Sequence, residues 1–126
     1  MIVAGFGFRR AATEASLADA LADALSRAAC DHPIAALATA QDKAATPVFQ
    51  SFAATQAKPT RAIAAEDLQA QSVLTHSEAS LETRRTGSVA EAAALAAAGP
   101  GAALLGPRII SQDGMATCAL AKGDGP

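Results

Sequence analysis

The chain has 126 residues and a formal net charge of −2. This length predicts a single domain built around one core. The slightly acidic balance argues against a general binder of nucleic acid or acidic membranes, because such proteins are normally basic. Aromatic residues make up 3% of the chain and all of them are phenylalanine, so the base-stacking surfaces of single-stranded nucleic-acid binders are not expected.

The sequence contains no recognisable motif for a metal site, a signal peptide or a membrane span. Cys30 and Cys118 are far apart, and His32 and His76 are isolated, so we expect two buried reduced thiols and no metal. The start of the chain lacks a basic segment followed by an apolar one, and no charge-free apolar stretch is long enough to cross a bilayer. These features predict a cytoplasmic protein.

The first half of the chain alternates between short apolar runs and helical patterns. A buried strand is predicted at residues 2–6, followed by a helix that begins at Thr13 or Ser16. Ser16 and Asp19 have the spacing of a capping box. Thr46-Pro47 predicts the start of another helix, because proline favours the first helical position. The other elements expected in this half are strands at residues 34–38 and 60–63 and a short helix opened by Glu66 and Asp67.

The second half predicts a long alanine-rich helix and an antiparallel end. Ser88 and Glu91 form the clearest capping box, and their helix is expected to run to about Ala98. Asp113-Gly114 predicts a hairpin turn. The remaining segments are a polar loop at residues 75–87, strands at residues 102–105 and 115–121, and a flexible tail at residues 122–126. The alternation predicts an α/β fold over residues 1–121: a single three-layer sandwich with a mostly parallel sheet and an antiparallel C-terminal hairpin.

Glycines followed by helices point to an anion-binding corner. Gly5 and Gly7 follow the first apolar run and precede Arg9 and Arg10, and Gly87 precedes a second helix. Glycine lets the backbone approach a ligand closely, and a helix N-terminus presents free N–H groups and the positive end of a dipole.

Ligands of open α/β sheets bind beyond the carboxyl ends of the strands. The turn at residues 5–10 is expected at one such end. Thr39, Asp42 and Lys43 follow the second strand and are expected at another, and the turn at residues 87–91 is expected to join them.

Several of these residues have a plainer interpretation. Gly5-x-Gly7 resembles the start of a dinucleotide fingerprint, but Arg10 occupies the third glycine position. Glu91 is either a general acid or base or only a cap for its helix. Lys43 is either a ligand contact or a solvated side chain, and one of the two neighbouring arginines is expected to point into solvent. His76 and Ser77 lack an orienting acid, so a nucleophile pair is disfavoured.

The ordered set of motifs resembles a known family. The motifs that carry the resemblance are Gly5-x-Gly7-x-Arg9-Arg10, Leu37-Ala38-Thr39 followed by Lys43, Thr75-x-Ser77, Gly87-Ser88-Val89-Ala90-Glu91, and Thr117-Cys118-Ala119-Leu120-Ala121. They occur in the same order in the cobalamin-biosynthesis CobE family, which is also the C-terminal domain of the longer protein CbiG. The resemblance covers nearly the whole chain.

The resemblance implies a role in building the corrin ring of vitamin B12. The two-domain relatives belong to the anaerobic route, where they open a lactone on a cobalt-bearing ring and release acetaldehyde. This chain resembles the short form associated with the aerobic route, so their hydrolytic activity is not expected. Arg108 stands where relatives tend to carry a lysine, which keeps the charge and changes the donor geometry.

Residues and resemblance together predict a binder of a polycarboxylate tetrapyrrole, either a precorrin or a compound like hydrogenobyrinic acid. No cofactor, metal, nucleic acid or membrane is expected, and other cobalamin-pathway enzymes are candidate partners. The alternatives are a hydrolase or isomerase that acts through Glu91 or Ser88, and a structural partner of another pathway enzyme. The candidate ligand-binding residues are Gly5, Gly7, Arg9, Arg10, Thr39, Lys43, Gly87, Ser88 and Glu91.

Overall fold

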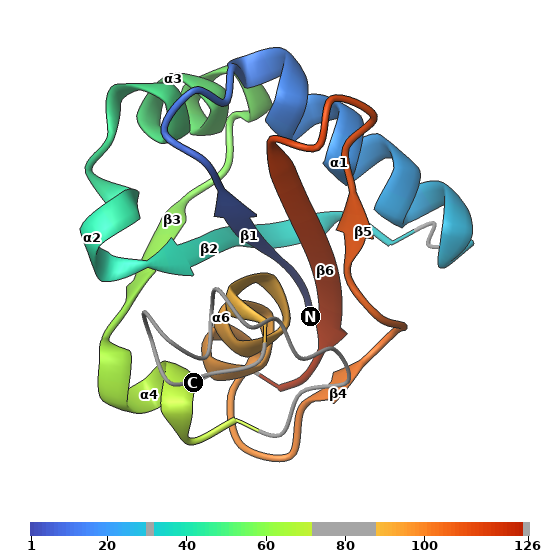
Figure 1. Cartoon of the computed structure of the whole chain (residues 1–126). Coiled ribbons are helices and arrows are strands. Elements are labelled where there is room, and N and C mark those ends of the chain that lie inside the picture. The colour runs from blue at the N-terminus through green and yellow to red at the C-terminus, as the bar shows by residue number, and fades with distance from the viewer. Residues whose placement is uncertain (30–31, 72–87, 125–126) are drawn as a thin grey trace.

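In the computed structural model, which describes residues 1–29, 32–71 and 88–124, one open mixed sheet lies between helices (Figure 1). The strand order is β3-β2-β1-β6-β4, and β5 also pairs with β6. The elements in chain order are β1 (Ile2–Phe8), α1 (Glu14–Arg27), β2 (Ile34–Ala40), α2 (Gln41–Ala44), α3 (Pro47–Gln56), β3 (Thr60–Ile63), α4 (Ala65–Gln69), α6 (Val89–Ala98), β4 (Ala103–Leu104), β5 (Ile109–Ile110) and β6 (Ala116–Lys122). The loop predicted at residues 75–87 lies outside the described residues.

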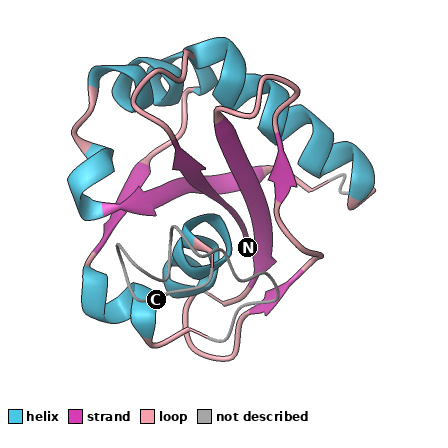
Figure 2. Cartoon of the chain, in the orientation of Figure 1, coloured by secondary structure: helices cyan, strands magenta, loops and turns pink. Residues whose placement is uncertain are grey.

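Two buried clusters cover the two faces of the sheet. The cluster beneath α1 and α3 is centred on Phe6, whose ring packs edge-on against Phe49 and Phe52 with centroid distances of 6.1 and 5.4 Å. The cluster on the other face joins α6 and α4 to the sheet and consists mostly of alanine, with Val3 and Leu68 among its larger members. Figure 2 shows α1 and α3 on one side of the strands and α4 and α6 on the other. The predicted three-layer α/β sandwich is confirmed.

The strand directions also follow the prediction. β1, β2 and β3 are parallel, whereas β6 is antiparallel to β1, and β4 and β5 are antiparallel to β6. The predicted hairpin turn connects β5 and β6, and Gly114 adopts a φ of 72° there, a conformation that favours glycine. The sheet therefore has a parallel part and an antiparallel C-terminal part.

β1 is two residues longer than predicted. Gly7 and Phe8 continue the strand because they pair with Thr117 and Ala116 of β6. The prediction that Gly5 and Gly7 form a turn after the strand is therefore wrong. β6 likewise continues to Lys122, one residue beyond the predicted strand end.

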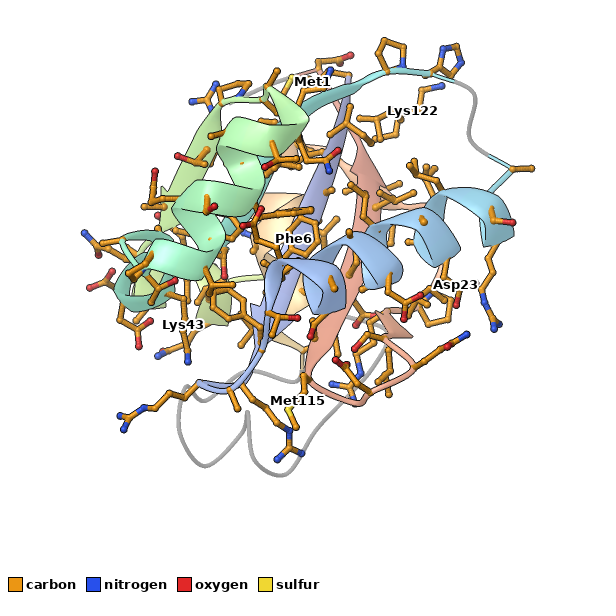
Figure 3. The ribbon with its side chains drawn as sticks, turned by 90° about the horizontal axis from the view of Figure 1, so that it is seen from above. Met1, Phe6, Asp23, Lys43, Met115 and Lys122 are labelled. Carbon is orange, nitrogen blue, oxygen red and sulfur yellow. The ribbon has the colours of Figure 1, made fainter. Side chains whose placement is uncertain are left out.

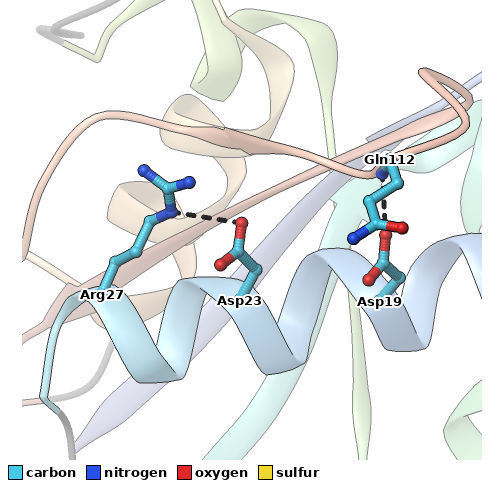
Figure 4. A network of polar contacts seen from close by, with 4 residues as sticks. All are labelled: Asp19, Asp23, Arg27 and Gln112. Atoms are coloured by element: carbon cyan, nitrogen blue, oxygen red, sulfur yellow. Dashed lines mark hydrogen bonds and ion pairs between the residues drawn. The ribbon is translucent and has the colours of Figure 1, made fainter.

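The capping box of α1 lies one turn earlier than predicted. Thr13 is the N-cap: its hydroxyl accepts a hydrogen bond from the Ser16 N–H at 3.3 Å, and the Ser16 hydroxyl accepts one from the Thr13 N–H at 3.1 Å. Asp19, the predicted partner of Ser16, instead accepts a hydrogen bond from the backbone N–H of Gln112 at 2.7 Å (Figure 4). The acid thus connects α1 to the β5–β6 turn.

The two glycines of β1 allow α6 to pack closely on the sheet. A methyl group at Gly5 would overlap the Ala90 carbonyl oxygen and lie 2.5 Å from the Ala94 nitrogen, both in the backbone of α6. At Gly7 the nearest atom to such a methyl would be the Thr117 Oγ1, at 3.0 Å. Gly5 therefore permits a contact between two backbones, whereas Gly7 faces a side chain that can rotate.

Asp113 connects the β5–β6 turn to the start of α1. Its Oδ1 accepts hydrogen bonds from the Ser111 hydroxyl at 2.6 Å and the Met115 N–H at 3.0 Å, and its Oδ2 accepts one from the Ser16 hydroxyl at 2.6 Å. The bond from Ser111, followed by those from Ser16 and Met115, holds the pKa of Asp113 below its ordinary value, because these donors favour the ionised carboxylate.

We expect Gly5→Ala to lower the free energy of unfolding by about 1–3 kcal/mol, because the backbone of α6 must move away from β1. Gly7→Ala is the matched control in the same strand, with an expected loss below about 1 kcal/mol. Urea denaturation of both variants measures the difference. Equal losses would show that the close approach at Gly5 does not constrain the helix.

Asp113 also predicts a dependence of stability on pH. Its pKa is lower in the folded chain than in the unfolded one, so its contribution is complete above the unfolded pKa and is lost as the pH falls through the folded pKa. We expect the difference in thermal midpoint between the wild type and Asp113→Asn to be constant near neutral pH and to shrink below about pH 4. A difference that stays constant down to the acid limit of folding would contradict this role.

Candidate functional site

The carboxyl ends of β1 and β2 lie at one edge of the sheet, because the two strands are parallel. Residues 8–10 leave β1 there, and residues 41–43 leave β2. The first turn of α6 lies beside the same end of β1, since Val89 is the nearest side chain of α6 to Gly7. We call this region the carboxyl edge and define it by residues 8–10, 41–43 and 88–91.

Arg9 and Arg10 are exposed at the carboxyl edge. The backbone N–H of Arg9 donates to the Met115 carbonyl at 2.8 Å, which fixes the exit of the chain from β1. Across the described parts of the chain, neither guanidinium group forms a hydrogen bond or an ion pair; the ion pair that forms there joins Arg27 to Asp23 on α1.

Lys43 brings a third cation to the carboxyl edge. Its ammonium group lies over the ring of Phe8, 5.3 Å from the centroid, and the ring of Phe8 stacks on Phe49 at 5.9 Å with an interplanar angle of 7°. Figure 3 shows Lys43 and Met115 toward one end of the molecule, and Met1 and Lys122 toward the opposite end. Lys43 therefore lies toward the end of the molecule at which Arg9 leaves β1, since the Arg9 N–H bonds the Met115 carbonyl.

The predicted residues inside the strands are buried. Thr39 has no exposed surface, and its hydroxyl donates to the Phe6 carbonyl at 2.8 Å, so it joins β2 to β1. Gly5 and Gly7 face α6. These three residues therefore have structural contacts inside the sheet, behind the carboxyl edge.

Ser88 and Glu91 are also fully buried. The Ser88 hydroxyl accepts a hydrogen bond from the Glu91 N–H at 3.3 Å and caps α6, as predicted. The Oε2 of Glu91 accepts a hydrogen bond from the backbone N–H of Arg108 at 2.9 Å. The Glu91 carboxylate thereby connects α6 to the segment that precedes β5. Gly87, the remaining candidate, lies outside the described residues.

A cavity of about 340 Å³ adjoins the carboxyl edge. Gln41 and Asp42 at the start of α2 line it together with Ile63 and Ala65, at the end of β3 and the start of α4. It therefore opens beyond the carboxyl ends of β2 and β3, next to Lys43. No local sequence pattern predicts this cavity, because it depends on how α2 and α4 turn away from the sheet.

The described residues offer few candidates for metal ligands or for reactive thiols. They contain no cluster of three histidine, cysteine or acidic side chains that would hold an ion. Cys118 is buried in β6, and desolvation raises the pKa of its thiol, which disfavours the reactive thiolate. Cys30 lies outside the described residues. No helix in the described parts is long and apolar enough to cross a membrane.

Sequence reasoning missed Phe8 as a part of this region. The signal available was its position directly before Arg9, in a chain with few aromatic residues. Its ring contacts Lys43, which lies 35 positions later in the sequence (43 against 8). No local pattern predicts a contact over that separation.

Comparison with known proteins identifies the family. The family described as "Cobalamin synthesis G C-terminus" matches residues 2–121. No curated protein sequence gives a significant match.

Three solved structures resemble the chain. CobE, a protein from the cobalamin biosynthetic pathway, is 30% identical with a TM-score of 0.85, over 100% of this chain and 92% of CobE. Cobalamin biosynthesis protein ChiG from Agrobacterium tumefaciens is 31% identical with a TM-score of 0.74, over 98% of this chain and 99% of ChiG. A putative cobalamin biosynthesis protein G homolog from Sulfolobus solfataricus shares the fold at 20% identity and a TM-score of 0.71, over 98% of this chain and 37% of the homolog. The chain therefore belongs to the cobalamin synthesis G C-terminus family, a family of the cobalamin biosynthetic pathway.

Proposed function

We propose that this protein binds a polycarboxylate tetrapyrrole intermediate of cobalamin biosynthesis at the carboxyl edge. The ligand is a precorrin or a corrin like hydrogenobyrinic acid, and the protein acts in the cytoplasm on the aerobic route. The observation that carries the proposal is the gathering of Arg9, Arg10 and Lys43 at one end of the sheet, with both guanidinium groups unpaired among the described side chains.

The chemistry of such a ligand suits these groups. Corrin precursors carry acetate and propionate carboxylates around a flat apolar ring. Arginine binds a carboxylate with two parallel hydrogen bonds, and lysine adds a point charge.

The positions of the cations also suit a flat tetrapyrrole ring. Lys43 lies over Phe8, which packs with the cluster beneath α1 and α3. Arg9 and Arg10 are exposed where the chain leaves β1. A ring laid across the ends of β1 and β2 could place its peripheral carboxylates against these cations.

An enzyme that hydrolyses or isomerises the intermediate is the second candidate. The observation that favours it is the buried carboxylate of Glu91, because a buried acid is costly and is often retained for chemistry. In the proposed binder this carboxylate has a structural task instead, since it accepts the N–H of Arg108.

Titration with a metal-free corrin tests the proposed binding. We expect hydrogenobyrinic acid to give a saturable absorbance change and to co-elute with the protein on gel filtration. The double variant Arg9→Ala/Lys43→Ala should weaken binding by about tenfold or more, because two charge-assisted contacts are lost.

Lys58→Ala/Arg61→Ala is the matched control, since it removes the same two charge types at the other end of β3. It should bind like the wild type. Equal weakening by both pairs would contradict a site at the carboxyl edge. No binding by folded wild type would overturn the proposal, and co-purification with another corrin enzyme would then support the structural-partner alternative.

A variant of Glu91 separates binding from catalysis. Glu91→Gln keeps an acceptor oxygen for the Arg108 N–H and removes the acid or base. We expect the free energy of unfolding to fall by about 1–3 kcal/mol and the affinity for hydrogenobyrinic acid to stay unchanged. Spectroscopic titration measures the affinity, and a growth assay measures cobalamin production. Wild-type affinity and stable folding without cobalamin production would favour the enzyme.

A further inference from the structure

Phe8 differs from the other aromatic residues of the chain. Phe6, Phe49 and Phe52 are buried in the cluster beneath α1 and α3, whereas Phe8 is half-buried at the very end of β1. It directly precedes Arg9 and carries the Lys43 ammonium group over its ring. An aromatic ring at this position has a contact that core packing alone does not require.

The surroundings of Phe8 hold its ring in a fixed orientation. The parallel stacking on Phe49 at 5.9 Å restrains the ring from the core side, and pairing of Phe8 with Ala116 fixes its backbone. A cation within about 6 Å of a ring centroid is attracted by the negative face of the ring. A rigid ring therefore restricts the positions of a long side chain that would otherwise be free.

We propose that Phe8 is a positioning residue for the bound anion: its ring holds the Lys43 ammonium group beside Arg9, so that one ligand carboxylate meets both cations. This inference rests on the proposed function. Lysine loses rotamer freedom when it binds an anion, and a side chain that is already restrained loses less of it on binding. Phe8 thus raises affinity without touching the ligand.

The first test needs no ligand. In protein labelled with ¹³C-lysine, the ε-methylene protons of Lys43 should resonate upfield of those of Lys58 and Lys122, because they lie over an aromatic ring. The displacement should disappear in Phe8→Leu and persist in Phe8→Tyr, which keeps a ring. Wild-type protein without the displacement would overturn the inference and leave the proposed binding untouched.

The second test measures coupling through the affinity for hydrogenobyrinic acid. Phe8→Leu should weaken binding by about two- to fivefold, and Phe8→Tyr should restore wild-type affinity. Lys43→Met keeps the apolar stem and removes the charge, and in that background Phe8→Leu should have no further effect. Equal weakening by Phe8→Leu in both backgrounds would overturn the positioning role, because Phe8 would then act without Lys43. An unchanged affinity in Phe8→Leu alone would overturn it as well.

Discussion

α6 packs on β1 with backbone against backbone. Gly5 provides the space, and α6 presents alanines such as Ala90 and Ala94 to the strand. Small side chains on both surfaces bring the helix onto the sheet with its first turn beside the end of β1. Ser88 and Glu91 at the start of the helix are fully buried. Each forms a hydrogen bond inside the protein, as buried polar groups require.

The carboxyl edge is built from both faces of the sheet. On the α6 face, Ser88 caps the helix and the Glu91 carboxylate holds the segment that leads into β5. On the other face, Phe49 supports Phe8, which in turn supports Lys43. Lys43 is thus supported by the half-buried ring of Phe8, which itself packs on the buried ring of Phe49. Such support favours a site that exists before its ligand arrives, because little ordering remains to oppose binding.

The sequence was sufficient to predict the structural features that depend on a few neighbouring residues. The alternation of elements, the cap at Ser88 and the turn at Asp113 were predicted, because periodicity, hydroxyl caps and turn residues act over a few positions. It misplaced contacts between distant segments. β1 continues through Gly7 because β6 supplies partners there, and Asp19 bonds Gln112 rather than Ser16. In the candidate site, the placement of Arg9 and Lys43 after strand ends depends on local pattern. The contact of Phe8 with Lys43 joins distant segments, and the sequence did not predict it.

The proposed binding of a polyanion needs a local explanation, because the net charge of −2 opposes such a ligand at long range. At physiological ionic strength, charges separated by more than about 8 Å are largely screened, so the groups next to the ligand decide the sign of the interaction. At the carboxyl edge these include Arg9 and Arg10, which are exposed and unpaired among the described residues. The same screening requires binding to weaken as salt is added. Ring recognition without charge contacts would instead be nearly independent of salt, so the salt dependence of affinity distinguishes carboxylate capture from apolar stacking.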